Sequence, residues 1–263
     1  DVNLYGLADP VTTATPKRAP PQHIIDVGGN YGGTAVALLR LYPQAKLVVL
    51  EPNPLLCRFL LWNLRNHGLL DRAWPLCAGL GPESLGLSLG HLAMETCNQP
   101  WVGGPVNTCI NLGLRTFTRG EAPETGGDGD EGDKGGGRRV VDVSVLPMRR
   151  LLEDFGWGSS VDLLKIDCEG CEWASFLHAA APWGVDNVVG EVHFGCAARS
   201  CWQGRNAAGP KVDNNCTVVE FASLRELANI LDRCRAHLPE NVAKSLPPGA
   251  SHAALLNKVG HRA

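Results

Sequence analysis

The sequence predicts an α/β fold in which helices cover both faces of a mostly parallel sheet. Short segments that are apolar almost throughout, at 23–27, 46–50 and 73–78, alternate with segments of helical periodicity. Such strands are typical of a parallel sheet that is buried on both faces. In addition, several of these segments end in acids, and the first runs into a glycine-rich turn. Open α/β sheets bind their ligands at these carboxyl ends.

The chain of 263 residues predicts one large domain after a short lead-in. Residues 1–22 contain four prolines and a threonine cluster and read as a linker. The domain then spans 23–263, with an insertion at about 121–137 that holds seven glycines and six acids among its residues. Because the insertion has no apolar periodicity, we expect it to be disordered and assign no chemistry to it.

The formal net charge of −3 predicts no general attraction to nucleic acids or to anionic membranes. No apolar run approaches the ~18 residues of a membrane span. The chain begins at Asp1 without a methionine or a signal-peptide pattern, which we interpret as a processed or trimmed segment. A small molecule or a glycan is the expected partner, and the oligomeric state is open.

Ten cysteines and one N-glycosylation sequon, Asn215-Cys216-Thr217, favour the lumen of the secretory pathway or the extracellular space. The alternative is a cytoplasmic protein in which Cys57, Cys77 and Cys168 are small buried apolar residues. Several other cysteines fall in expected loops: Cys97, Cys109, Cys196, Cys201 and Cys216.

In the first part of the chain, a strand at His23–Val27 leads through the glycine turn into an amphipathic helix that Pro43 ends. A second strand at Lys46–Leu50 is followed by a helix that begins at Pro54, with Asn53 as its cap, and ends around 67–68. The third strand is expected at Ala73–Ala78.

The second part of the chain is expected to be less regular. Residues 82–120 and 195–216 are expected to be irregular, and 240–263 should supply the last strands, with Ala253–Val259 as a weak candidate. The remaining expected elements are a strand at Val140–Val145, a short helix near Arg149–Asp154, a strand from Val161 to the acids at 167–172, a helix through Trp173, Phe176, Leu177 and Ala180, a strand at Asn187–Phe194, and a helix from Phe221 to Leu238.

The strand ends predict the kind of ligand. Acids follow four of the five strands, within 26–32, at Glu51, within 167–170 and within 191–193. Such a pocket suits a ligand with hydroxyls and a positive charge. Glu51 stands where an acid accepts hydrogen bonds from a ribose diol, and the glycine turn has no lysine of the phosphate-binding type. Because Asn30 replaces the middle glycine of a dinucleotide fingerprint, the register Asp26, Gly28, Gly32 predicts a nucleoside without a pyrophosphate.

Three segments resemble the FkbM-type family of class I S-adenosylmethionine-dependent methyltransferases. Residues 26–32 (DVGGNYG) are similar to that family's D-V-G-A-N-x-G turn, residues 51–54 (EPNP) to its E-P-N-P turn, and residues 164–172 (LKIDCEGCE) to its L-K-I-D-x-E-G-x-E segment. The resemblance covers roughly residues 23–195. Gly29 departs from an alanine, and Cys168 and Cys171 stand at small apolar positions. Residues 147–152 (PMRRLL) stand in place of the T-L-D-x-L-L segment, which removes an acid at 149.

The resemblance implies a seven-stranded Rossmann-like sheet, the class I methyltransferase fold, with S-adenosyl-L-methionine as cofactor. It also implies methyl transfer, usually to a hydroxyl oxygen. The implied cofactor residues are Asp26, Gly28, Asn30 and Gly32 for the amino acid part, Glu51 for the ribose with Asn53 beside it, Ala78 near the adenine, and Asp167, with Glu169, on the side of the sulfonium and the acceptor.

A sugar hydroxyl is a weak nucleophile until it loses its proton, so a base should assist the transfer. His193, Asp167 and Glu169 are the candidates, and our hypothesis is that His193 or Asp167 takes the proton. Alternatively, the acids cap helices and His193 is structural.

We assign no metal, although Cys196, Cys201 and Cys216 with His193 are a zinc alternative. Cys168-x-x-Cys171 has redox spacing, but packing or a local disulfide is favoured.

Two other functions remain open. A nicotinamide-dependent oxidoreductase would need the full glycine fingerprint and a hydride-handling pair, which the sequence lacks. A non-catalytic nucleotide-binding or scaffold domain would keep the acids at the strand ends.

Overall fold

A computed structural model describes residues 19–81, 88–95, 138–168, 171–172, 184–194, 211–213 and 216–238. The predicted insertion at 121–137, most of the lead-in, the predicted helix after Glu172 and the tail from 240 lie outside these ranges. In chain order the elements are β1 (His23–Val27), α1 (Gly33–Leu41), β2 (Lys46–Leu50), α2 (Pro54–Asn66), β3 (Ala73–Leu76), β4 (Ala78–Gly81), β5 (Ser88–Glu95), β6 (Arg138–Pro147), α3 (Met148–Asp154), β7 (Ser160–Ile166), β8 (Gly184–Phe194), β9 (Lys211–Asp213), β10 (Cys216–Phe221) and α4 (Leu224–Arg233).

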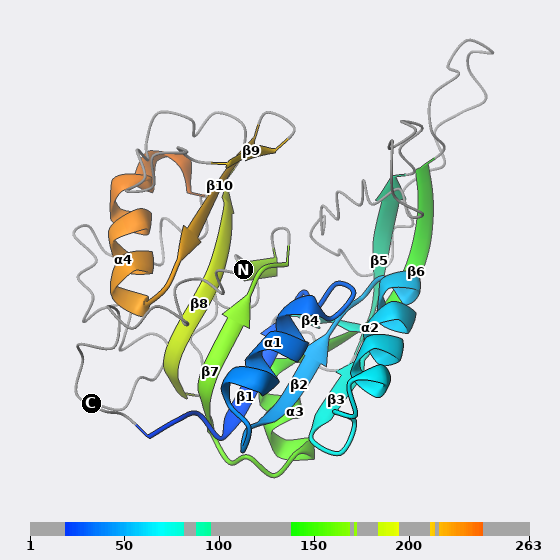
Figure 1. Ribbon diagram of the computed structural model, residues 1–263. Coiled ribbons are helices and arrows are strands. Elements are labelled where there is room, and N and C mark those ends of the chain that lie inside the picture. The colour runs from blue at the N-terminus through cyan, green and yellow to red at the C-terminus, as the bar shows by residue number, and fades with distance from the viewer. Residues whose placement is uncertain are drawn as a thin grey trace, which may run out of the picture.

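The main sheet has the strand order β3-β2-β1-β7-β8-β10-β9 (Figure 1). The adjacent strands β3, β2, β1, β7 and β8 run parallel to one another. Strand β10 runs antiparallel to β8 and to β9. The expected α/β fold with a mostly parallel sheet is therefore confirmed. A second sheet of order β4-β6-β5 lies beside the first, with β4 parallel and β5 antiparallel to β6.

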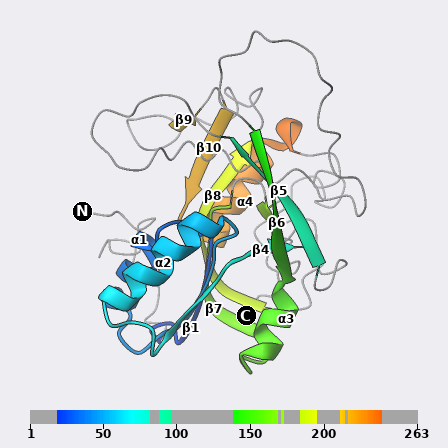
Figure 2. The ribbon, with the colours of Figure 1, turned by 90° about the vertical axis from the view of Figure 1, so that its right-hand side faces the viewer.

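The alternating side chains of the buried strands divide the core into two clusters. Ile24, Leu47 and Val49 face one way and pack in a cluster with residues of α1 and α2. Ile25, Val48 and Leu50 belong to the other cluster, which contains residues of α3 and α4. Figure 2 shows α1 and α2 on one side of β1 and β7, and α3 and α4 on the other. Successive residues of a strand point to opposite faces, which explains the two sets.

The first two predicted strands and both helix starts are confirmed. The side-chain oxygen of Asn53 accepts from the amides of Leu55 (2.9 Å) and Leu56 (3.3 Å), so Asn53 caps α2 as predicted, with Pro54 at its first position. Helix α1 ends at Leu41, just before Pro43.

Four expectations about secondary structure were wrong. The segment 73–78 is not one strand, because β3 ends at Leu76 and β4 starts in the second sheet at Ala78. Strand β5 lies within 82–120, and β9 and β10 lie within or just after 195–216, where an irregular chain was expected. Phe221 ends a strand and does not start a helix, since Ser223 caps α4 through its hydroxyl, which accepts from the amide of Glu226 (3.2 Å).

Within the described residues, no helix combines the length and the hydropathy that a bilayer crossing needs.

Candidate functional site

The carboxyl ends of β1 and β7 meet where the strand order of the main sheet reverses. From β1 the chain moves outward to β2 and β3, and it then returns to β7 on the other side of β1. The amides of Gly28 and Gly29 donate to the carbonyl of Leu50 (3.0 and 2.9 Å), and the amide of Asp167 donates to the carbonyl of Val27 (3.0 Å). These bonds bring the three predicted motifs to one edge, where open α/β sheets bind their ligands.

The glycine turn needs its glycines for two reasons. Gly28 and Gly32 have φ of 82° and 92°, a region that residues with a Cβ atom rarely adopt. A Cβ atom on Gly28 would also overlap the carbonyl oxygen of Asp167. Asn30 has φ of 51°, which asparagine tolerates better than most residues, and its side-chain oxygen accepts from the amide of Tyr31 (2.8 Å). The turn is thus closely fitted to the end of β7.

Glu51 joins the end of β2 to the glycine turn. Its carboxylate is 2% exposed and accepts from the amide of Asn30 (2.7 Å) with one oxygen and from that of Asn53 (2.8 Å) with the other. Burial raises the pKa of the Glu51 carboxyl, although the two amide bonds act in the opposite direction. Each carboxylate oxygen has a further lone pair for a hydroxyl donor.

Asn53 is fully buried beside Glu51. Its oxygen caps α2, but its amide nitrogen has no hydrogen-bond acceptor among the described residues. A buried donor without an acceptor costs about 1–3 kcal/mol, so an acceptor on a ligand would be stabilising here.

A buried ion pair that was not predicted from the sequence lies beneath the turn. The ammonium of Lys165 is 3.0 Å from the carboxylate of Asp26, and the two side chains are 2% and 0% exposed. The same ammonium donates to the carbonyls of Gly28 (2.7 Å) and Val27 (3.3 Å). The signal in the sequence was the lysine itself, which stands in the apolar run 163–166 of a central strand.

The environment of this pair shifts both groups. Burial raises the pKa of Asp26 above its ordinary value of 3.8, although Lys165 pulls it downward. Burial acts to lower the pKa of Lys165, but Asp26 and Asp167 outweigh it and raise the pKa above 10.5. Asp26 therefore lies under the turn, paired with Lys165, and its direct contact with a cofactor stays a prediction.

His193 lies near the end of β8, among three acids. Its Nδ1 atom is 2.9 Å from Oε1 of Glu172, the same oxygen that accepts from the amide of His193 (2.9 Å). Its Nε2 atom is 3.8 Å from Oδ1 of Asp167 and 3.8 Å from Oε2 of Glu191. His193 is 12% exposed and Glu172 only 1%. The structure therefore brings the predicted residues His193 and Asp167 together.

No role for Glu172 follows from the sequence alone. An ionised carboxylate accepts hydrogen bonds and cannot donate one, so its contact with Nδ1 places the imidazole proton on that nitrogen. The Nε2 atom of a neutral His193 then carries the lone pair and faces Asp167.

Among the described residues, Asp167, Glu191 and His193 form one group at this edge that could hold a metal ion. One ligand atom from each lies within 4.8 Å of the others. Carboxylate oxygens and an imidazole nitrogen suit several divalent cations. Cys196 and Cys201, two of the residues of the alternative zinc site, lie outside the described residues.

Two disulfides lie near this edge. Cys57 of α2 is bonded to Cys77, the residue between β3 and β4, and Cys168 is bonded to Cys171. The predicted local disulfide at 168–171 is therefore present, whereas the alternative in which Cys57, Cys77 and Cys168 are unpaired apolar residues is wrong. Ala78 is buried at the start of β4. Glu169 lies outside the described residues, so its predicted role is untested.

Comparison with known proteins gives one family. The model of the FkbM methyltransferase domain matches residues 26–237. Methyltransferase sdnD of Sordaria araneosa is 28% identical over 156 residues, which is 57% of this chain and 57% of that protein. The match thus covers little more than half of the curated relative.

Two solved structures resemble parts of the fold. Methyltransferase FkbM of Methylobacillus flagellatus KT is 12% identical with a TM-score of 0.37, over 71% of this chain and 36% of that one. The S-adenosylmethionine-dependent methyltransferase SibL in its apo form is 24% identical with a TM-score of 0.24, over 32% and 27% of the two chains.

Proposed function

We propose that this chain, which belongs to the FkbM methyltransferase family, is an S-adenosylmethionine-dependent enzyme of the class I methyltransferase fold. In this proposal it methylates a hydroxyl oxygen of a carbohydrate or of a similar polyhydroxylated acceptor. The observation that carries the proposal is the juxtaposition of His193, oriented by Glu172, with the glycine turn and the acids at the reversal of strand order.

The residues at this edge suit the cofactor chemically. S-adenosylmethionine carries a sulfonium, an ammonium and a ribose diol, and the edge offers the carboxylates of Glu51, Asp167 and Glu191. The buried amide nitrogen of Asn53 supplies a donor that has no acceptor among the described residues. Glu51 would hold the ribose, the turn from Gly28 to Gly32 would hold the amino acid part, and Ala78 would lie near the adenine.

The chain's own contribution to the reaction is positioning and proton removal. When bound, the cofactor supplies an electrophilic methyl group. Aligning an acceptor oxygen with it can lower the barrier by up to ~7–11 kcal/mol. With its proton held on Nδ1 by Glu172, His193 removes the hydroxyl proton through Nε2, which adds about 10²–10⁴-fold. Asp167, 3.8 Å from Nε2, stabilises the imidazolium that forms.

A polyhydroxylated acceptor is the class that this edge favours. Asp167 and Glu191 are 26% and 16% exposed, so their oxygens can accept hydrogen bonds from the acceptor's other hydroxyls. The same negative charges would disfavour a phosphorylated or carboxylated acceptor.

The proposed location is the lumen of the secretory pathway or the extracellular space. Support comes from the disulfides Cys57–Cys77 and Cys168–Cys171 and from a third at Cys234. Disulfides persist in oxidising compartments and are rare in the cytosol.

Calorimetry with S-adenosylmethionine, S-adenosylhomocysteine and NAD tests the cofactor. We expect the first two to bind and NAD not to bind, and binding of NAD alone would overturn the proposal. Transfer of a radiolabelled methyl group to a panel of methyl glycosides and free oligosaccharides tests the reaction. Cofactor binding without transfer to any polyol or other nucleophile would favour a scaffold domain.

A further inference from the structure

The Cys168–Cys171 disulfide lies between the two acids that contact opposite nitrogens of His193. Asp167 directly precedes the first cysteine and reaches Nε2 (3.8 Å), and Glu172 directly follows the second and reaches Nδ1 (2.9 Å). The disulfide therefore closes the short segment that sets both acids. Resting on the proposed function of His193, we propose that Glu172 is its positioning residue and that the disulfide is a redox-modification site that holds Glu172 in place.

The contacts of Glu172 carry the first half of this inference. Its side chain is 1% exposed, and one oxygen receives both the amide and the Nδ1 atom of His193. A carboxylate fixed in this way sets both the tautomer and the orientation of an imidazole. Loss of such an orienting partner typically costs 10–100-fold in function at metal sites, where the same device is used.

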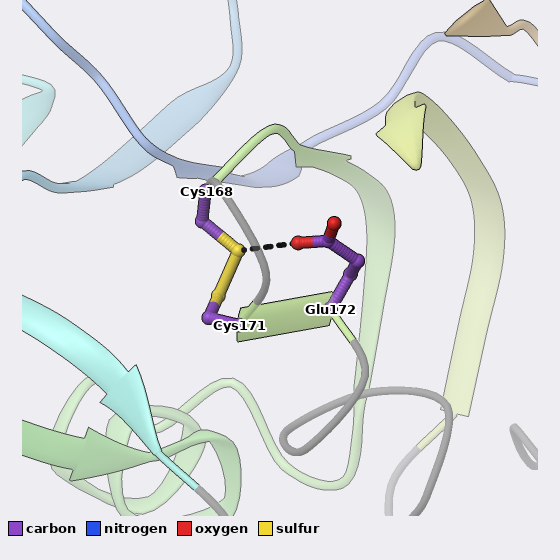
Figure 3. Close-up of side chains that lie close together, drawn as sticks. All are labelled: Cys168, Cys171 and Glu172. Carbon is purple, nitrogen blue, oxygen red and sulfur yellow. Dashed lines mark hydrogen bonds between the residues drawn. A yellow bond between two sulfur atoms is a disulfide. The ribbon is translucent and has the colours of Figure 1, made fainter. Parts of the chain in front are cut away.

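The contact between Glu172 and the disulfide carries the second half. The sulfur of Cys168 lies 3.3 Å from Oε2 of Glu172 (Figure 3), whereas the amide and the Nδ1 atom of His193 are bonded to Oε1. A disulfide sulfur has no proton to donate, whereas a thiol at the same place is a hydrogen-bond donor. Reduction therefore removes the covalent restraint on the segment and gives Glu172 a second hydrogen-bond donor, at Oε2, which can draw the carboxylate away from His193.

The partial exposure of Cys168 lets a reductant reach the Cys168–Cys171 disulfide. Cys171 is 4% exposed, while Cys168 is only partly buried at the edge of the core. A dithiol reductant attacks one sulfur and then closes to its own disulfide. The Cys168–Cys171 bond breaks, each protein sulfur gains a proton, and the two electrons come from the dithiol. Reoxidation by a disulfide donor reverses each step.

The test uses ¹⁵N-histidine NMR, because its readout needs no methyl acceptor. Spectra are recorded at a pH where the imidazoles are neutral, before and after dithiothreitol, and the His193 signals are assigned by their loss in His193→Asn. The oxidised protein should show the proton of His193 on Nδ1. The reduced protein should show a mixture of the two tautomers, and reoxidation should restore the first spectrum.

Four variants separate the effect of the Cys168–Cys171 disulfide on Glu172 from other causes. Glu172→Gln keeps an acceptor oxygen and should keep the Nδ1 tautomer, whereas Glu172→Leu should lose it. Cys168→Ala/Cys171→Ala removes the covalent restraint without supplying a thiol, so it should lose part of the Nδ1 tautomer before any reductant is added and should not respond to dithiothreitol. The matched control Cys57→Ala/Cys77→Ala removes another disulfide and should respond to dithiothreitol as the wild type does.

An unchanged His193 spectrum, with reduction of Cys168 and Cys171 verified by mass spectrometry, would overturn the proposal. If the Cys168→Ala/Cys171→Ala variant does not fold, the comparison of oxidised with reduced wild type still decides. If the protein bound no S-adenosylmethionine, the proposed function would fail, whereas the tautomer readout would still report on the positioning by Glu172.

Discussion

Replacing Lys165 by methionine should strongly destabilise the protein. The substitution keeps the length of the side chain but removes the ammonium that lies 3.0 Å from Asp26 and donates to the carbonyls of Gly28 and Val27. Breaking a buried ion pair by removing one partner costs about 3–5 kcal/mol, because the other charge stays buried without compensation. That is a large share of the ~5–15 kcal/mol by which folded domains are stable.

The loss should depend on pH in a defined direction. Burial already raises the pKa of Asp26 above 3.8, and removing Lys165 removes the main opposing influence. A carboxyl whose pKa is higher in the folded state stabilises folding below its unfolded pKa, and this contribution disappears as the pH rises through the folded pKa. The deficit of Lys165→Met should therefore be smaller near pH 4, where the two lost carbonyl bonds remain its main cause, and grow toward neutral pH.

Urea unfolding followed by tryptophan fluorescence, with the disulfides intact, measures this effect. The double variant Lys165→Met/Asp26→Leu leaves no buried charge and should recover most of the loss, since apolar replacements of buried ion pairs are often neutral. A deficit below about 1 kcal/mol at pH 7, or a double variant no more stable than the single one, would refute the reasoning.

Three further predictions concern the same edge. Gly28→Ala should cost more than about 3 kcal/mol in urea unfolding, because both its φ of 82° and the overlap of its Cβ oppose it. The matched Gly68→Ala has φ of 65° but open space and should cost only about 1–2 kcal/mol; equal losses would contradict the overlap. Cys57→Ala/Cys77→Ala should lower the free energy of unfolding by roughly 3 kcal/mol in thermal unfolding, because the disulfide joins residues 20 positions apart. An unchanged melting temperature would contradict this prediction. Glu51→Gln should weaken the binding of S-adenosylhomocysteine by about tenfold or more in calorimetry, and unaltered affinity would exclude Glu51 from the ribose site.

The part of the fold that local patterns determine could be predicted from the sequence. Strands β1 and β2 are short apolar runs between turn residues, and the start of α2 follows from Asn53 and Pro54, so their boundaries agree with the structure. Strands β4, β5 and β6 pair in a separate sheet, and which strands pair depends on contacts far apart in the chain. Periodicity does not contain that information, which is why 73–78 was expected to be one strand.

The candidate site was predictable to a similar degree. The positions of Glu51, Asp167 and His193 at strand ends followed from the order of the elements. The contacts of Lys165 and Glu172 did not follow, because their partners lie far away in the chain. Lys165 pairs with Asp26, 139 positions away, and Glu172 contacts His193, 21 positions away. A lysine within a buried strand predicts an ion pair but not its partner. Similarly, the spacing of Cys168 and Cys171 indicates a disulfide but not its contact with Glu172.

A comparison of methyl transfer by His193→Asn and by the wild type tests most directly the central claim that His193 is the base. Both proteins are incubated with radiolabelled S-adenosylmethionine at saturation and the panel of methyl glycosides and oligosaccharides, and cofactor affinity is measured in parallel by calorimetry. We expect the variant to lose about 10²-fold or more of the turnover while its cofactor affinity stays within about twofold of the wild type. A variant that keeps more than about a tenth of the wild-type turnover would show that His193 is not the base.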